Sequence, residues 1–213
     1  MYILYGWKLT GSLAIEAALR ELEVDFEFRP IDTQAKQQNA ESYRQINLRQ
    51  QVPALVLPDG TVLTECAAIL LHLADAFPKA NLAPKPGTSE RGTLNRWMLF
   101  FAVNIYEGEL RKTYPQNFTS DPDGLTAVWT SADAYLKRHY LIVEQVLTQS
   151  PYFFGEQFTI LDIYVWMLAQ WMDIAWLKTH CPKIIALTTA VMNRPKIASV
   201  HKAHFGEGLG IKS

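Results

Sequence analysis

Residues 51–76 read QVPALVLPDGTVLTECAAILLHLADA and hold the strongest folding signal in the chain. Pro53 has no N–H to give to a sheet, so we expect it at the start or the edge of a strand. The Pro-Asp-Gly triplet at 58–60 favours a tight turn, and residues 61–63 then return as a hairpin partner. From 66 to 76 the apolar side chains recur at helical spacing. This stretch therefore predicts strand, turn, strand and helix.

The residues before this stretch predict a second unit of the same kind. Residues 2–5 are typical of a short buried strand, and 26–29 alternate apolar and polar side chains as a half-buried strand does. Between them, Ser12 can cap a helix with one apolar face. A strand–helix–strand crossover gives a parallel pair, whereas the later hairpin gives an antiparallel pair. We therefore expect a mixed four-stranded sheet, with a polar segment and a short helix around 40–46.

The residues after this stretch are helical almost throughout. Phe77–Gly87 contains three prolines and is the best candidate for a linker. Beyond it, the spacing predicts a long helix around 94–105, a loop at 115–124 and a second long helix at 125–149. Thr159 and Asp162 resemble a capping box that opens a Trp-rich helix to about 178. A further helix at 183–193 is expected to stop at Arg194-Pro195.

Composition narrows the class of protein. The chain has 213 residues, of which 49% are hydrophobic, and 20 Lys+Arg against 21 Asp+Glu leave a net charge of −1. This apolar content excludes a disordered chain, and the missing basic excess argues against nucleic-acid and polybasic membrane binding. Two distant cysteines fit a reducing compartment. We find no signal peptide, no membrane span and no metal-ligand spacing, so a cytoplasmic protein is expected.

Several motifs in order carry a family resemblance. Gln51–Leu55, Leu63–Asp75 and Phe158–Ile163 together resemble cytosolic glutathione transferases, nearest in pattern to the bacterial beta-type members. The resemblance covers essentially the whole chain. It implies a thioredoxin-like α/β glutathione-binding domain at 1–76, a linker at 77–87 and an all-helical substrate domain at 88–213. It also implies a homodimer with glutathione as co-substrate.

The resemblance places the glutathione site at the hairpin and at the start of the helix after it. It implies that the Val52–Pro53 bond is cis, so that the backbone of Val52 pairs with the peptide as an added strand does. The helix start at Glu65 and Cys66 offers unpaired N–H groups to the γ-glutamyl carboxylate. Further contacts that the resemblance implies are Glu65 to the ligand ammonium, Gln51 to the same end of the peptide and Lys36 to the glycyl carboxylate. Cys66 itself is best explained as a small buried side chain.

The group that activates the thiol remains open. A thiol with a pKa of about 8.5 is mostly protonated at neutral pH, so a nearby donor or a helix N-terminus must favour the thiolate. Beta-type members carry a Cys just before the Ser-Leu pair, where this chain has Gly11. The candidate donors are Ser12, Thr10 and Tyr5 in that order, or a backbone N–H such as that of Gly11. Tyr5 is better explained as a core aromatic, and Ser12 is equally well explained as a plain helix cap.

The resemblance also suggests where an electrophile would bind. Tyr106 falls where beta-type members often place a His near the sulfur, although it could equally be a surface residue. Apolar walls are expected from a set of large side chains, since ligand pockets are mostly hydrophobic. The candidates are Trp7, Phe100, Val103, Tyr164 and Trp171.

Three functions are consistent with these residues. The first is conjugation, in which the glutathione thiolate attacks a small hydrophobic electrophile, as a detoxifying transferase would do. The second is glutathione-dependent disulfide or peroxide reduction, which Gly11 in the place of a Cys makes less favourable. The third is a non-catalytic binding protein that has kept the fold. An isomerase similar to the zeta-type members is disfavoured, because their Ser-Ser-Cys run before the first helix is absent.

Overall fold

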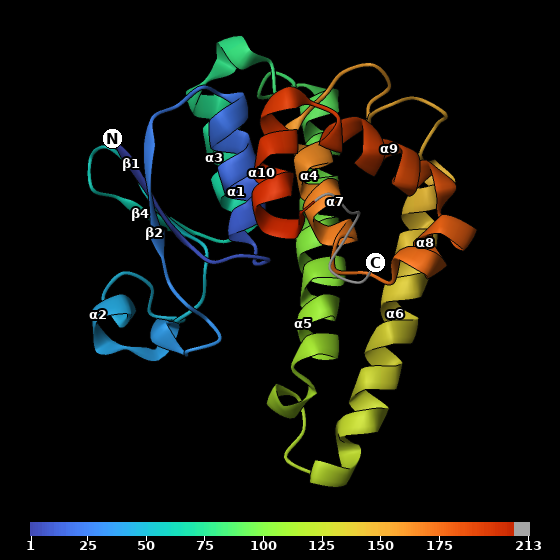
Figure 1. Cartoon of the computed structure of the whole chain (residues 1–213). Coiled ribbons are helices and arrows are strands. Elements are labelled where there is room, and N and C mark those ends of the chain that lie inside the picture. Colours follow the sequence, from blue (N-terminus) through green and yellow to red (C-terminus); the bar gives the residue numbers. More distant parts are fainter. Residues whose placement is uncertain (207–213) are drawn as a thin grey trace. The chain divides into compact units, whose positions relative to one another are not determined.

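The computed structural model describes residues 1–206 and contains two compact units (Figure 1). The first unit combines Met1–Pro84 with the segment that begins at Met192, and the second spans Lys85–Val191. The C-terminal segment therefore belongs by its contacts to the first unit. The sequence leaves open whether the glycine-rich stretch Phe205–Gly210 covers the ligand site that the resemblance implies, and its residues from 207 onward lie outside the described residues.

A four-stranded mixed sheet forms the centre of the first unit. Its strand order is β2-β1-β3-β4. β1 pairs with β2 in parallel and with β3 antiparallel, and β3 pairs with β4 antiparallel. The expected mixed sheet is therefore confirmed. The strands are β1 (Tyr2–Gly6), β2 (Phe26–Pro30), β3 (Ala54–Val56) and β4 (Val62–Thr64).

Helices cover this sheet and bury its apolar side chains. α1 (Ser12–Glu21) and α3 (Cys66–Ala76) lie side by side against one face (Figure 1). Leu4 in β1 is fully buried. The neighbouring side chain, Tyr5, must point to the opposite face, and its ring lies 5.9 Å from that of Tyr43 in α2 (Glu41–Arg44). The sheet therefore lies between α1 and α3 on one side and α2 on the other.

The last described helix was not expected from the sequence. α10 (Pro195–Phe205) follows directly after the predicted stop and packs against α1 (Figure 1). Pro195 occupies its first turn, where a missing N–H costs nothing because that N–H has no partner within the helix. Arg194 is bonded to the carboxylate of Glu21 at 2.8 Å. The Arg194-Pro195 step thus separates the helix that ends at Met192 from α10.

The second unit is helical, as predicted. Its core contains large, fully buried side chains such as Tyr140 and Trp166. A π-helical segment, Phe101–Tyr106, joins its first two helices. Short 3-10 turns in the chain cover Gln37–Asn39, Pro78–Ala80, Pro115–Asn117 and Pro122–Gly124. The helices are α4 (Ser89–Phe100), α5 (Glu107–Thr113), α6 (Leu125–Val146), α7 (Ile160–Ala169), α8 (Ile174–His180) and α9 (Pro182–Met192).

The predicted capping box opens α7. Asp162 is fully buried and accepts hydrogen bonds from the N–H of Thr159 at 2.7 Å and from that of Phe153 at 2.6 Å. The Trp-rich helix expected to reach about 178 is in fact broken after Ala169, and Asp173 caps α8 by accepting two backbone N–H bonds. The prediction of one continuous helix was wrong because apolar periodicity continues across the break.

No single described helix has the length and hydropathy of a membrane span. α7 and α8 satisfy those criteria when they are joined, but they are bent by 119° at their break.

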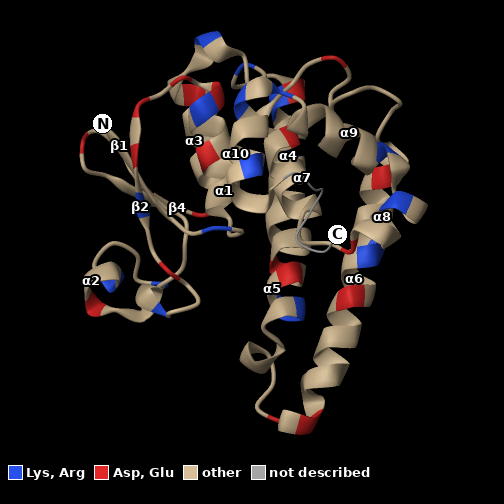
Figure 2. Ribbon diagram, in the orientation of Figure 1, with Lys and Arg blue, Asp and Glu red and all other residues tan. Residues whose placement is uncertain are grey.

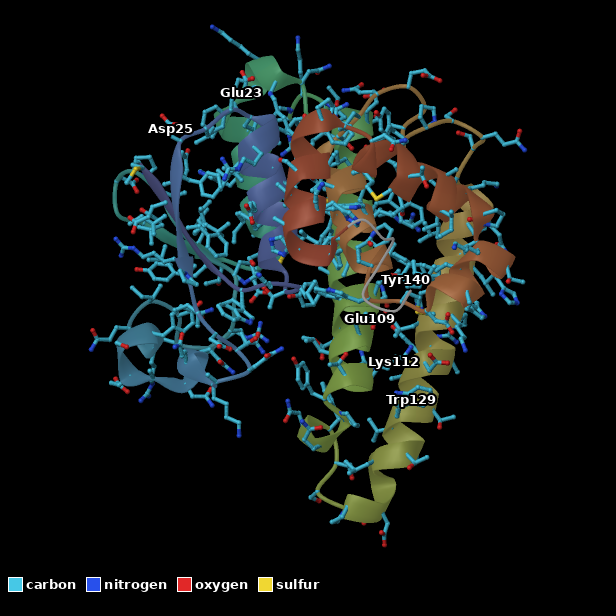
Figure 3. The ribbon with its side chains drawn as sticks, in the orientation of Figure 1. Glu23, Asp25, Glu109, Lys112, Trp129 and Tyr140 are labelled. Atoms are coloured by element: carbon cyan, nitrogen blue, oxygen red, sulfur yellow. The ribbon has the colours of Figure 1, made fainter. Side chains whose placement is uncertain are left out.

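An ion-pair cluster fastens α5 to α6. The Lys112 ammonium lies 2.6 Å from Asp133, and Lys137 lies 2.7 Å from the other oxygen of the same carboxylate. Lys112 also lies over the ring of Trp129 at 5.6 Å (both labelled in Figure 3). Burial opposes ionisation of Asp133, but the bonds and charges of the two lysines outweigh it and lower its pKa. Both acidic and basic residues occur along these two helices (Figure 2).

Candidate functional site

The peptide edge expected at Val52 is present in the first unit. The Val52–Pro53 bond is cis, as the resemblance implies. Val52 is half-buried and lies just before β3. Within residues 1–206, no hydrogen bond joins its N–H or C=O to another group. Its backbone thus has the pairing capacity that an added strand requires.

The segment before Val52 is held by two side chains that the sequence did not reveal. The carbonyl of Gln51 accepts hydrogen bonds from the Tyr43 hydroxyl at 2.8 Å and from the Asn47 amide at 2.7 Å. Burial raises the pKa of Tyr43 above its ordinary value, so the hydroxyl remains a donor. Both donors are buried. They fix the carbonyl of Gln51, whose side chain is exposed.

The start of α3 has backbone N–H groups without partners in the helix, as the first turn of any helix does. Among the described residues 1–206, no side chain caps this helix. Glu65 precedes the helix with a left-handed φ of 66°. Its exposed carboxylate is bonded to Arg49 at 2.7 Å, a second cation that sequence reasoning missed. The Cys66 thiol is buried and donates to the carbonyl of Gly11 at 3.4 Å, so it points away from solvent.

Ser12 does not cap α1, contrary to expectation. Gly11 is the N-cap, without a side-chain hydrogen bond, and Ser12 is the first helical residue. Ser12 is fully buried, and its hydroxyl donates to the carbonyl of Trp7 at 3.0 Å. Thr10 is half-buried and donates to the same carbonyl at 2.9 Å, with the two hydroxyl oxygens 3.0 Å apart. Residues 7–12 thus form a turn that is closed by hydrogen bonds of its own side-chain hydroxyls. We call it the knotted turn, without any topological knot being meant.

The knotted turn requires glycine at position 6. A Cβ on Gly6 would lie 2.3 Å from the Cβ of Ser12 and 2.4 Å from its Oγ. Only a residue without a side chain allows β1 and the start of α1 to approach so closely. The burial of Ser12 is therefore set by Gly6.

The remaining predicted residues of the first unit lie at its surface. The Tyr5 hydroxyl accepts a bond from Arg29 at 2.9 Å, and Arg29 also pairs with Glu27 at 2.7 Å. Lys36 is exposed, with a left-handed φ of 58°, just before the 3-10 turn at 37–39. Tyr5 therefore already has a cationic partner, whereas Lys36 is open to solvent.

The predicted pocket residues of the second unit differ in their surroundings. Tyr106 packs its ring against Trp171 at 5.2 Å and Tyr164 at 6.5 Å between centroids. Phe100 is part of an aromatic cluster with Trp97 at 5.1 Å. Val103, by contrast, is 61% exposed. Trp7 belongs to the first unit and Tyr106 to the second.

A widened helical turn presents Tyr106. The π-helical segment Phe101–Tyr106 is stabilised by Asn104, whose amide donates to the carbonyl of Phe100 at 3.1 Å. The hydroxyl of Tyr135 in α6 donates in turn to the oxygen of Asn104 at 2.6 Å. Such π segments are frequent at functional sites. Sequence periodicity cannot reveal one, because it shifts the helical phase by a single residue.

Family models match both units of the chain. The model described as the N-terminal domain of glutathione S-transferase matches residues 1–75, and that of the C-terminal domain matches residues 122–191.

Relatives of known sequence are similar over nearly the whole chain. Glutathione S-transferase GstA from Escherichia coli O157:H7 is 30% identical over 93% of this chain and 94% of its own. The uncharacterised GST-like protein YncG from Escherichia coli K12 is 29% identical over 95% of this chain and 96% of its own.

Solved structures share the fold. A glutathione transferase homologue from Sulfitobacter with bound glutathione superposes with a TM-score of 0.87 at 25% identity, covering 95% of this chain and 98% of its own. A glutathione transferase from Methylococcus capsulatus has a TM-score of 0.81 at 30% identity, covering 96% and 98%. With the thioredoxin-like sheet, the helical second unit and these full-length matches, the chain belongs to the glutathione S-transferase family.

Proposed function

We propose that the protein binds glutathione on its first unit and conjugates the thiol to a small hydrophobic electrophile. The observation that carries this proposal is the unpaired backbone of Val52 together with the uncapped start of α3. The register of β3 and β4, in which Ala54 pairs with Thr64, brings the two close together. A peptide with a carboxylate at one end matches both features. The bound glutathione in structures of the same fold supports this choice of peptide.

In the proposed complex the peptide adds a short strand at Val52. The N–H and C=O of Val52 pair with the cysteinyl backbone of glutathione. The γ-glutamyl carboxylate lies at the α3 N-terminus, where the helix dipole favours negative charge. Glu65 meets the ligand ammonium, Gln51 adds a polar contact, and Lys36 meets the glycyl carboxylate. Arg49 beside Glu65 offers a further cation for the γ-glutamyl end.

The thiol is proposed to ionise at the knotted turn. The burial of Ser12 leaves its hydroxyl no free surface, so Thr10 becomes the first candidate donor. The Thr10 hydroxyl donates a hydrogen bond to the Trp7 carbonyl at 2.9 Å, but it can rotate toward a sulfur. The N–H of Gly11 at the α1 N-terminus is the backbone alternative. Both groups would stabilise the thiolate rather than the thiol.

The thiolate then forms a carbon–sulfur bond with the electrophile and displaces its leaving group. The aromatic surface around Tyr106 and Trp171 in the second unit is the proposed contact of the electrophile, with Phe100 and Val103 of the same unit as further walls. The protein's contribution is position and an ionised thiol. We further propose a cytoplasmic homodimer with a detoxifying role, and sizing at micromolar concentration tests the dimer.

A calorimetric titration with reduced glutathione, followed by a chloronitrobenzene conjugation assay, tests this function. We expect saturable binding and formation of the thioether. If the protein binds glutathione and reduces a mixed disulfide but forms no thioether, its activity is that of a disulfide reductase and not of a transferase. Absence of binding would leave a non-catalytic member of the family.

A further inference from the structure

His204, close to the end of α10, joins the knotted turn to α1. The N–H of Leu9 donates to Nδ1 of His204 at 3.3 Å, and Nε2 of the same ring lies 3.1 Å from the Glu16 carboxylate. The three residues come from the turn, from α1 and from the C-terminal helix. A residue nearly two hundred positions away in sequence therefore touches the segment that holds the thiol-donor candidates.

The two contacts fix the state of the imidazole. Because Nδ1 accepts a hydrogen bond from the Leu9 N–H, the ring hydrogen must be on Nε2. From there it forms the hydrogen bond to the Glu16 carboxylate. The His204 side chain is 5% exposed and that of Glu16 is 15% exposed. The bridge is therefore shielded from water. A carboxylate on one ring nitrogen selects the tautomer that the other nitrogen needs.

Leu9 needs an external support. Its φ is 61°, in the left-handed region that non-glycine residues seldom adopt. Such conformations persist where surrounding groups determine them, and they cluster at functional sites. The hydroxyl bonds of the knotted turn involve Trp7, Thr10 and Ser12 and leave the Leu9 peptide unheld. The bond to His204 supplies the support at that peptide.

We propose that His204 is a positioning residue for thiol activation, and that it acts through Leu9. It sets the direction of the turn that presents the Thr10 hydroxyl and the Gly11 N–H to the sulfur. This inference rests on the proposed function. It adds that the C-terminal helix, through one imidazole, determines how strongly the bound thiol is ionised.

Three variants separate positioning from mere docking of α10. His204→Phe keeps the ring volume and removes both bonds. His204→Asn keeps an acceptor near the place of Nδ1 and loses Glu16. Lys196→Ala is the matched control, since Lys196 anchors the other end of α10 to Glu23 at 2.8 Å and to the carbonyl of Glu21. It loosens the helix without touching the knotted turn.

The readouts are kcat with a chloronitrobenzene, the Kd of glutathione, and the pKa of the bound thiol from its ultraviolet thiolate absorbance against pH. In His204→Phe we expect a higher thiol pKa and a kcat lower by about tenfold or more, because small misplacements of reacting groups are that costly. The Kd should stay within about twofold, since the binding groups at Val52 and α3 are untouched. His204→Asn should recover most of the kcat. Lys196→Ala should lower the melting temperature and leave kcat and thiol pKa unchanged.

A thiol pKa in His204→Phe equal to that of the wild type and of Lys196→Ala would overturn the assignment. Hydrogen exchange of the Leu9 amide tests the bond without any ligand, and faster exchange in His204→Phe is expected. If Leu9 exchange is unchanged in His204→Phe and this variant still binds glutathione, the role of His204 is overturned and the proposed function stands. A wild-type protein that binds no glutathione overturns the proposed function.

Discussion

The Tyr43 hydroxyl donates a 2.8 Å hydrogen bond to the carbonyl of Gln51, immediately before the peptide edge at Val52. This contact ties α2 to the entry of β3, on the sheet face opposite to α1 and α3. It places a buried phenol behind the groups proposed to bind the ligand. The position of the proposed peptide edge at Val52 thus depends on a side chain that lies behind it.

Replacing Tyr43 with Phe tests this support. The carbonyl keeps its bond from Asn47, so we expect a loss of about 1 kcal/mol in the free energy of unfolding, typical of one hydrogen bond. The affinity for glutathione should fall several-fold, because the edge at Val52 gains freedom. Urea unfolding and calorimetry measure the two effects. Unchanged affinity together with lowered stability would show that the bond serves the fold alone.

Gly6→Ala should disrupt the knotted turn. The new Cβ would overlap Ser12 at 2.3 Å, and overpacking in a buried site costs about 1–3 kcal/mol. Gly92→Ala in α4 is the control, since no side chain or distant backbone of the described residues lies within 4 Å of the added Cβ. That change should stabilise the protein by roughly 0.5–1 kcal/mol through helix propensity. Thermal unfolding of both variants checks the prediction, and a tolerated Gly6→Ala would refute the close approach.

The hydroxyls of the knotted turn should differ in function. Thr10→Val removes a candidate donor without changing the shape of the side chain, and we expect a lower kcat and a higher pKa of the bound thiol. Ser12→Ala removes a buried hydroxyl bonded to Trp7, so we expect lower stability with kcat nearly unchanged. Conjugation kinetics and unfolding of the two variants compare them directly. Equal rates for Thr10→Val and the wild type would leave the backbone N–H of Gly11 as the donor.

The π-helical segment that ends at Tyr106 should affect how tightly the electrophile binds. Asn104→Ala removes the bonds to Phe100 and Tyr135, and the π-helical segment should relax toward a regular helix that redirects Tyr106. We expect a higher KM for the electrophile and an unchanged Kd for glutathione, since the change lies in the second unit. Steady-state kinetics with varied electrophile measure this. A changed glutathione affinity with a constant electrophile KM would contradict it.

The link between α5 and α6 should weaken in acid. The lysines hold the pKa of Asp133 below its ordinary value, so the folded state favours the ionised carboxylate. The stability this group contributes is present above about pH 4 and is lost as the pH falls through the lowered pKa. Asp133→Asn should therefore cost about 2 kcal/mol at pH 7 and less at pH 3. Urea unfolding at several pH values tests this, and a cost that grows in acid would contradict it.

Local patterns were sufficient for much of the fold. The stretch from Gln51 to Ala76 carries its turn, its strand-opening proline and its apolar period in adjacent residues, and the hairpin and α3 follow as predicted. The capping box at Thr159 is equally local. The helix after Pro195 was missed because a proline is compatible both with an end and with a first turn.

The site was less accessible from the sequence. Its backbone elements follow from motifs, but Tyr43, Arg49 and His204 act through contacts that form after folding. Nothing in their neighbours in sequence distinguishes them from ordinary surface or core residues. The burial of Ser12 also depends on its approach to Gly6, a distance that no periodicity encodes.

An amide NMR titration of the full chain with reduced glutathione tests the central claim most directly. The account predicts that the signals of Val52 and Ala67 shift together and saturate with one Kd, because one peptide pairs with the edge and places its carboxylate at the start of α3. Shifts that do not saturate, or that spare both amides, would contradict glutathione binding at this site.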